Sequence, residues 1–177
     1  HNTNQLCNSY SNKFYKLNNL KKIQDPMLEL GRFCVDPNYR DPKIIMTAWS
    51  AIRKLVEKNK IKFLFGCSSF IGTSIDRYLD CFKFLKTKYI APKKYNLYVK
   101  APKVFKFNNL INLNNFCLKK AKKNLPPLLS FYLNLGGWVS DHVVIDYDLE
   151  TMHVFTGLEV KEIPEKRLKF LNKINLN

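Results

Sequence analysis

The sequence predicts an α/β sandwich in which at least some of the strands pair in parallel. Short apolar runs typical of buried strands alternate along the chain with stretches whose apolar residues recur at helical spacing. Such alternation favours helices packed against a sheet. The chain has 177 residues, of which 46% are hydrophobic, so it is long and apolar enough to bury the core of one domain.

The first part of the chain begins with a polar segment. Residues 1–27 contain a Lys-Lys pair and show no clear period, so we expect them to form a loop. Residues 28–35, with the sequence LELGRFCV, form a mostly apolar run closed by an Asp-Pro pair, which is typical of a buried strand. Residues 43–59 carry apolar side chains at helical spacing, and Asp41 followed by a proline is a typical helix start.

The remaining elements follow in the same alternation. Residues 61–67 are expected to form a second buried strand, and the pattern from Thr73 to Asp76 resembles a capping box that opens a helix. Residues 90–124 are irregular and basic, with a short strand expected at 95–99. The last part is expected to form a helix over 125–135, a strand pair over 138–145 and 152–160, and an amphipathic helix over 163–172. We therefore divide the chain into a polar N-terminal segment and a single domain over 28–177 with a basic insert at 90–124.

Composition argues against several classes of protein. No run approaches the ~20 apolar residues that a membrane-spanning helix needs, and residues 1–22 lack the apolar core of a signal peptide. The five cysteines are odd in number and include no C-x-x-C pair, which disfavours a disulfide framework or a zinc site and suits a reducing cytoplasm. We expect no bound metal. Because the chain begins at His1 rather than at a methionine, we expect it to be part of a longer protein.

The net charge of +16 is concentrated in one stretch of the chain. From Cys81 to Ser140 there is no Asp or Glu, and the lysines of this stretch account for +12. A surface of this kind attracts a polyanion, which can be a nucleic acid, an anionic membrane or an acidic protein. It can also be a solvated face without a partner. The lysines are 83, 86, 88, 93, 94, 100, 103, 106, 119, 120, 122 and 123.

Two charged residues lie within the first apolar run. Glu29 and Arg32 either form a structural ion pair or belong to a functional site, because a buried charge is costly unless it is paired or used. Val35 and Arg40 follow between this strand and the helix over 43–59. The free N–H groups and the dipole of a helix N-terminus favour an anion, and Arg40 would add a positive charge there.

Three segments of the chain carry a specific resemblance. Glu29-x-x-Arg32 followed by VDPNYR, the segment FLFGCSSFIGT over 63–73, and the segment over 125–160 occur in an order and at a spacing similar to those of GNAT-like ornithine-acyl-carrier-protein N-acyltransferases, the family of ornithine lipid synthesis. The resemblance covers residues 28–164. Acyl-homoserine-lactone synthases are distantly similar through their own Glu-x-x-Arg. The resemblance implies a GNAT-like three-layer sandwich with a mixed central sheet, from which the N-terminal part of the family's fold is missing.

The resemblance also implies a reaction. A (3-hydroxy)fatty acyl group would move from acyl carrier protein to the α-amino group of ornithine by direct aminolysis, giving lyso-ornithine lipid. No cofactor would be bound permanently, because the acyl-phosphopantetheine arm of the carrier is the donor. Where the family's relatives with acetyl-CoA have glycines, this chain has Asp41, Pro42 and Lys43, which favours a carrier-borne arm over acetyl-CoA.

The resemblance assigns roles to individual residues. Glu29 would be the proton acceptor or ammonium anchor, and Arg32 would orient Glu29 or hold the substrate carboxylate. The phosphopantetheine arm would be bound by Val35, Arg40, Lys43, Ser68 and Ser69, and the cationic side chain of ornithine by Asp141 and Asp146. Cys67 has no histidine near it in the sequence, which disfavours a nucleophilic thiol.

Other functions remain as alternatives at this point. An acyl-homoserine-lactone synthase and an N-acyl-glycine synthase would share the same chemistry. A nucleic-acid-binding basic module would use aromatic residues among the lysines, such as Tyr95 and Tyr98, but no nucleic-acid motif accompanies them, so nucleic acid is not the expected partner. The expected partners are acyl carrier protein, an amino acid and an anionic membrane surface, with the protein in the cytoplasm at the periphery of the inner membrane.

Overall fold

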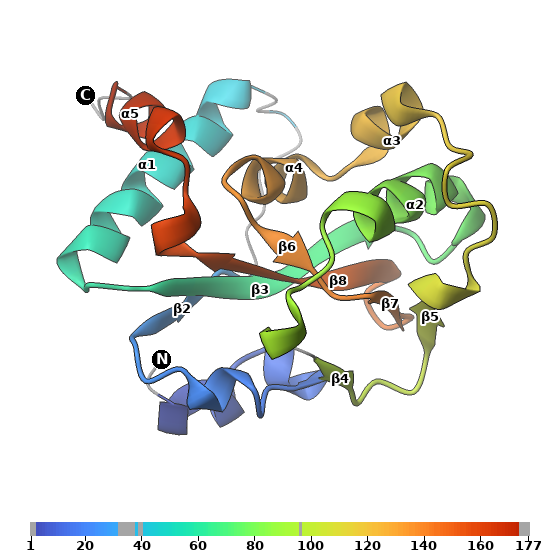
Figure 1. Ribbon diagram of the computed structural model, residues 1–177, viewed down its shortest axis with the longest axis horizontal. Helices are drawn as coiled ribbons and strands as arrows, with labels where there is room; N and C mark the ends of the chain where they lie inside the picture. Colours follow the sequence, from blue (N-terminus) through green and yellow to red (C-terminus); the bar gives the residue numbers. More distant parts are fainter. Residues whose placement is uncertain (1–2, 32–37, 39–40, 96, 174–177) are drawn as a thin grey trace.

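A computed structural model describes residues 3–31, 38, 41–95 and 97–173. The described residues form a six-stranded sheet with the strand order β2-β3-β8-β7-β5, and β6 pairs with β8 beyond the end of β7 (Figure 1). β2 is parallel to β3 and the other neighbours are antiparallel, so the sheet is mixed and the expected parallel pairing is confirmed. The strands are β2 (Met27–Glu29), β3 (Phe63–Ile71), β5 (Val104–Lys106), β6 (Trp138–Val139), β7 (His142–Asp146) and β8 (Thr151–Glu159).

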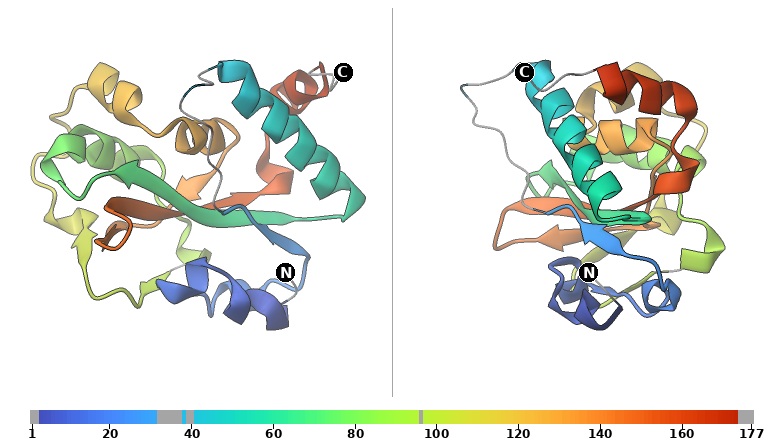
Figure 2. Two further views of the ribbon diagram at one scale, coloured as in Figure 1. Left: turned by 180° about the vertical axis from the view of Figure 1, so that it is seen from behind. Right: turned by 90° about the vertical axis from the view of Figure 1, so that its left-hand side faces the viewer.

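The α-helices lie together on one face of this sheet (Figures 1 and 2). They are α1 (Pro42–Lys58), α2 (Leu79–Lys88), α3 (Leu118–Asn124), α4 (Pro127–Asn134) and α5 (Glu165–Lys173). Short 3-10 helices η4 (Asp76–Tyr78), η5 (Lys93–Tyr95), η6 (Phe107–Asn109) and η7 (Val160–Glu162) join these elements. Helices, sheet and the N-terminal segment on the opposite face make three layers, as the resemblance implies.

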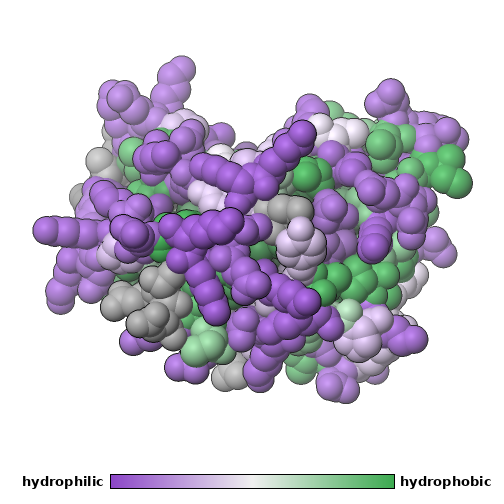
Figure 3. Space-filling view, turned by 60° about the horizontal axis from the view of Figure 1, so that its bottom comes forward, coloured by the Kyte–Doolittle hydropathy of each residue, from purple (hydrophilic) through white to green (hydrophobic). Residues whose placement is uncertain are grey.

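The N-terminal segment covers the second face of the sheet. It contains the 3-10 helices η1 (Thr3–Asn8), η2 (Ser11–Lys13) and η3 (Leu20–Lys22), and its strand β1 (Tyr15–Lys16) pairs with β4 (Tyr98–Val99). Leu6, Leu17 and Leu20 are fully buried in a core cluster that also contains Phe65 and Phe155 of the sheet. The loop expected for residues 1–27 is therefore wrong for this part, because widely spaced apolar residues bury here without a regular period. Polar side chains cover most of the outer surface of this face (Figure 3).

Alternation along β3 separates the two cores. Phe63 and Phe65 face the N-terminal segment, whereas Leu64 and Phe70 face the helices, as the two-residue period of a strand requires. The apolar side chains of β8 divide in the same way. The sheet is thus buried on both faces, which explains why its two long strands are almost continuously apolar.

Several predicted elements are confirmed and others need correction. Helix α1 begins as expected, because the Asp41 carboxylate accepts a hydrogen bond from the backbone N–H of Lys43 at 2.8 Å. The capping box at Thr73 is wrong: α2 begins only at Leu79, after η4, and no side-chain cap hydrogen bond forms there. The strand expected over 138–145 is broken into β6 and β7.

Candidate active site

Glu29 ends strand β2 with its carboxylate directed towards the N-terminal segment. Oε1 accepts hydrogen bonds from the backbone N–H and the hydroxyl of Ser11, both at 2.7 Å, and Oε2 accepts one from the backbone N–H of Tyr10 at 2.9 Å. Three donors that lie 18 and 19 positions away in the sequence therefore hold the half-buried carboxylate in one orientation. This placement suits a charged group that must point in a defined direction.

Strands β2 and β3 pair only over a short length. The last residue pair between the two strands is Glu29 with Phe65. The N–H of Leu30 then donates a final hydrogen bond to the carbonyl of Phe65 at 2.7 Å. β3 continues to Ile71. Beyond Phe65, no described strand pairs with the edge of β3 that faces β2. A side chain at Gly66 would collide with the Leu30 carbonyl, so the two backbones approach each other closely just before they part.

Ser68 and Ser69 lie within β3, not after it as the sequence predicts, because the strand is longer than its apolar run. Ser68 is buried on the helix side, where its Oγ accepts a hydrogen bond from the Thr156 hydroxyl at 2.9 Å. Ser69 is exposed on the opposite face, and its register partner on β8 is His153. The two serines thus point to different faces of the sheet, and only Ser69 is open to a ligand.

The proposed phosphate site is described only in part. Lys43 is exposed in the first turn of α1, where its N–H is bonded to Asp41. The remaining predicted residues, Arg32, Val35 and Arg40, lie outside the described residues.

Asp141 and Asp146 lie at opposite ends of β7 and have different partners. Asp141 is exposed, and its Oδ1 is 2.7 Å from Nδ1 of His142; this hydrogen bond lowers the pKa of the Asp141 carboxyl. Asp146 accepts hydrogen bonds from the N–H groups of Asp148 and Leu149, which shape the turn to β8. Two strands, β3 and β8, separate β7 from the strand that carries Glu29.

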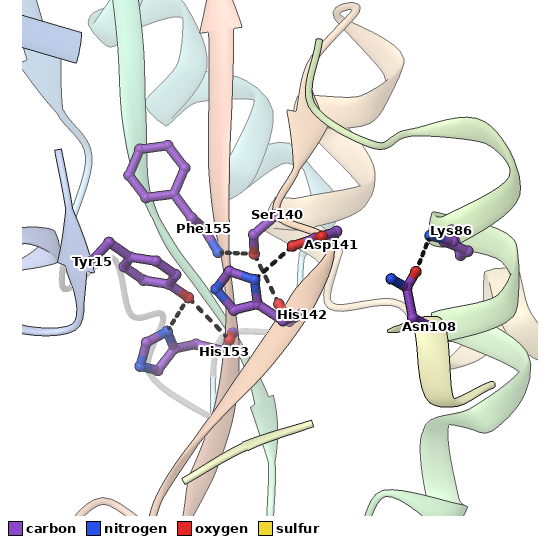
Figure 4. A network of polar contacts seen from close by, with 8 residues as sticks. All are labelled: Tyr15, Lys86, Asn108, Ser140, Asp141, His142, His153 and Phe155. Carbon is purple, nitrogen blue, oxygen red and sulfur yellow. Dashed lines mark hydrogen bonds and ion pairs between the residues drawn. The ribbon is translucent and has the colours of Figure 1, made fainter. Parts of the chain in front are cut away.

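A two-residue bulge divides β6 from β7 and builds a buried polar network (Figure 4). The Ser140 hydroxyl accepts a hydrogen bond from the N–H of Phe155 at 3.0 Å and donates one to the carbonyl of His142 at 2.8 Å. It thereby replaces the ladder bonds that the bulge interrupts. The network was not predicted as a unit; the only signal in the sequence was two histidines within apolar strands.

Tyr15 extends this network from the N-terminal segment, which covers that face of the sheet. Its hydroxyl lies 3.2 Å from Nδ1 of His153, as Figure 4 shows. Tyr15 and His153 are both almost completely buried, and the ring of Phe14 packs edge-on against His153 at 4.6 Å between centroids. Burial lowers the pKa of His153 to about 4, so its imidazole is neutral at pH 7.

The neutral His153 predicts a specific loss of stability in acid. Its folded pKa lies below the unfolded value of about 6.5, so as the pH falls the unfolded chain binds a proton first. The free energy of unfolding should fall by roughly 3 kcal/mol between pH 7 and pH 4 from this residue. Urea unfolding at a series of pH values measures this slope. His153→Gln should flatten it between pH 6.5 and 4, and a slope equal to that of the wild type would contradict the assignment.

Cys67 is positioned as a half-buried, protonated thiol. Burial raises its pKa to about 12, opposed by the contact of its sulfur with the Ser11 hydroxyl at 3.5 Å. A thiol of this kind is a poor nucleophile at neutral pH. Among the described side chains, no group of three His, Cys, Asp or Glu comes together as a metal site.

Comparisons with known proteins point to one family. The profile described as an acetyltransferase (GNAT) domain matches residues 1–50, which include Glu29. The chain is 28% identical over 164 residues to the L-ornithine N(alpha)-acyltransferase of Rhodobacter capsulatus, covering 93% of this chain and 62% of that protein. It is 29% identical over 143 residues to the protein of the same name from Rhizobium meliloti, covering 81% and 48%.

A third relative with this name, from Brucella abortus, is 28% identical over 163 residues, which cover 91% of this chain and 58% of the relative. The chain thus spans about half to three fifths of the length of the curated relatives it matches. No solved structure matches it. These findings confirm the resemblance and the fold that the sequence predicts. The chain is therefore similar to the L-ornithine N(alpha)-acyltransferases, and its mixed α/β fold agrees with the GNAT domain matched over residues 1–50.

Proposed function

We propose that this chain carries the acyl-transfer centre of an N-acyltransferase that moves a (3-hydroxy)fatty acyl group from acyl carrier protein to the α-amino group of ornithine. The observation that carries the proposal is the position of Glu29. Its carboxylate is held by three hydrogen bonds at the point where β2 and β3 stop pairing. The names of the relatives support ornithine as the acceptor.

In the proposed reaction the amine attacks the thioester carbonyl directly. A C–N bond forms, a tetrahedral oxyanion develops, and the C–S bond breaks to release the pantetheine thiol. Glu29 takes the proton that the attacking amine loses, or anchors the ammonium group before that loss. In a GNAT-like arrangement the pantetheine arm enters where two parallel strands splay apart, which corresponds here to the unpaired edge of β3 beyond Phe65.

The other roles in the proposal follow the resemblance. Arg32 orients Glu29 or holds the carboxylate of ornithine, and Asp141 and Asp146 bind its cationic side chain. Val35, Arg40 and Lys43 bind the phosphate of the arm at the start of α1, and Ser69 lines the path of the arm. Ser68 is left out of this role because it is buried on the other face of the sheet.

The basic stretch supplies the proposed docking surface for the carrier. Helix α3 has only Ala121 buried, and its lysines are exposed. Acyl carrier protein is acidic and the product is a lipid, so one positive face can attract both the carrier and an anionic membrane. Leu118 of the same helix and Ile111 of the same basic stretch are exposed and would add apolar contact with a lipid surface. None of the described helices has the length and apolarity to span a membrane.

Lipid analysis tests the proposal. Cells of a bacterial host without ornithine lipids, expressing the full-length protein, should accumulate an N-acylated ornithine that mass spectrometry detects. Acid hydrolysis of the new lipid identifies the amino acid, so glycine in place of ornithine would point to an N-acyl-glycine synthase. Cells that express a folded wild-type protein and make no new acyl-amino acid would overturn the proposal.

A further inference from the structure

Two aromatic side chains between the sheet and the helices carry hydrogen-bond donors without a partner. Trp49 of α1 and Tyr132 of α4 are each 2% exposed. Within the described part of the chain, neither the indole Nε1 of Trp49 nor the hydroxyl of Tyr132 has a hydrogen-bond partner. A buried polar group left in this state costs about 1–3 kcal/mol. Each such group in a native structure requires an explanation, and a ligand that accepts a hydrogen bond from both donors would supply one.

The two rings form one rigid unit. Trp49 and Tyr132 pack edge to face with their centroids 5.0 Å apart. Phe131, the neighbour of Tyr132 on α4, stacks on the indole with their centroids 4.9 Å apart. The directions of both donors are therefore set by packing before any ligand arrives, which lowers the entropy lost on binding.

Their position is next to the proposed catalytic carboxylate. Trp49 and Tyr132 belong to an apolar cluster that includes Leu64 of β3, with Leu28 and Leu30 of the β2 region packed against it. Burial raises the pKa of the Tyr132 hydroxyl, and the charge of Glu29 raises it further. The phenol therefore lies within electrostatic reach of Glu29 and stays protonated, as a donor, at neutral pH. Glu29 points to the face that the N-terminal segment covers, whereas this pair lies on the helix face.

We propose that the Nε1 of Trp49 and the hydroxyl of Tyr132 bind the acyl-pantetheine arm by donating hydrogen bonds to its carbonyl oxygens. The inference rests on the proposed function and deepens it. The arm is narrow and uncharged beyond its phosphate, and it carries amide and thioester carbonyls between apolar segments. An indole N–H can only donate, which matches a carbonyl acceptor. The Tyr132 hydroxyl donates to the thioester oxygen, on which negative charge develops in the transition state. The indole N–H of Trp49 donates to an amide oxygen of the arm.

Substitutions that keep the rings test this assignment kinetically. Tyr132→Phe should lower kcat about 100-fold, as the loss of one oxyanion donor does. Trp49→Phe should raise the KM for acyl carrier protein about 10-fold with a smaller change in kcat. Because the Tyr132 hydroxyl has no partner in the unliganded protein, the melting temperature of Tyr132→Phe should equal or exceed that of the wild type. If the Tyr132 hydroxyl had a purely structural role, Tyr132→Phe would have a lower melting temperature than the wild type and unchanged kinetics.

Tyr15→Phe is the matched control. This second buried tyrosine donates its hydroxyl within the network around His153. Its removal should lower the melting temperature and leave turnover near that of the wild type. If Tyr132→Phe behaves like this control, the inference is overturned.

A binding experiment gives a readout that does not depend on activity. The protein has two tryptophans, so Trp138→Phe leaves Trp49 as the sole indole. The probe is an unreactive thioether analogue of acyl-pantetheine that keeps the acyl carbonyl. Its binding should change the Trp49 emission saturably, and Tyr132→Phe should weaken that binding about 10-fold, the size expected for one hydrogen bond.

The two experiments separate failure of the inference from failure of the proposed function. If the probe changes Trp49 emission but the wild type acylates no ornithine, the proposed acceptor is wrong and the assignment of the two donors stands. Failure of the probe to change the emission at saturating concentration, or equal binding by the Tyr132→Phe variant, would overturn the inference.

Discussion

Replacing Glu29 with glutamine should lower the turnover number about 100-fold or more while the protein remains folded. The amide cannot take a proton from the attacking amine, and general-base catalysis contributes about 10²–10⁴-fold. In addition, the side-chain NH₂ must face one of the three donors from Tyr10 and Ser11, so the orientation of the group is lost as well. Acyl transfer to ornithine, measured with saturating acyl carrier protein, gives the turnover number.

Two controls separate chemistry from packing in this experiment. Glu57→Gln removes an exposed carboxylate on α1 that pairs with Arg53, and it should leave turnover unchanged. Ser11→Ala keeps the carboxylate but removes one of its donors, and it should reduce turnover far less than Glu29→Gln. Circular dichroism checks the fold of each variant. A folded Glu29→Gln protein with near-normal turnover would rule out the catalytic role.

Reversing the charge of Lys119, Lys122 and Lys123 should raise the KM for acyl carrier protein about 10-fold at low salt and weaken binding to anionic vesicles. These lysines are exposed on α3, within a stretch that has no acidic residue. Salt screens such attraction over ~8 Å at physiological ionic strength, so the difference in KM should shrink at high salt. Turnover at saturating carrier should change little, because the lysines lie outside the reacting centre.

The choice of lysines follows from their contacts. Lys94 is 2.6 Å from Glu159 and Lys120 is 3.6 Å from Asp80, so reversing either would also break an ion pair. The matched control reverses Lys54, Lys58 and Lys60 at and just after the end of α1, on the opposite side of the molecule from α3 in Figure 1. It changes the net charge equally and should leave KM and vesicle binding unchanged. Kinetics at two salt concentrations and vesicle sedimentation provide the test. Wild-type values for both properties in the α3 variant would mean that the stretch is only a solvated surface.

The layered fold could be derived from the sequence, and Glu29 could be singled out as a candidate. Alternating strand and helix patterns are local properties, because a period of 2 or 3.6 residues decides which side chains share a face. The start of α1 was predictable for the same reason, since the Asp41 carboxylate accepts a hydrogen bond from the N–H of Lys43, two residues further on. Glu29 was conspicuous because a carboxylate within an apolar strand is costly unless it has partners or a function. The family resemblance rested on the same segment, and the comparisons bear it out.

The partners of these residues were decided by the tertiary structure alone. Glu29 is held by Tyr10 and Ser11, from a segment without a detectable period, and Tyr15 meets His153 across 138 positions in the sequence. The bulge at Ser140 arises because β6 and β7 both pair with β8 in different registers. The residue pattern of one strand does not encode such a register. The unpartnered donors of Trp49 and Tyr132 likewise exist only once α1 and α4 pack together. Hydrogen bonds and burial between distant segments depend on how whole layers pack, whereas periodicity reports only on neighbours along the chain.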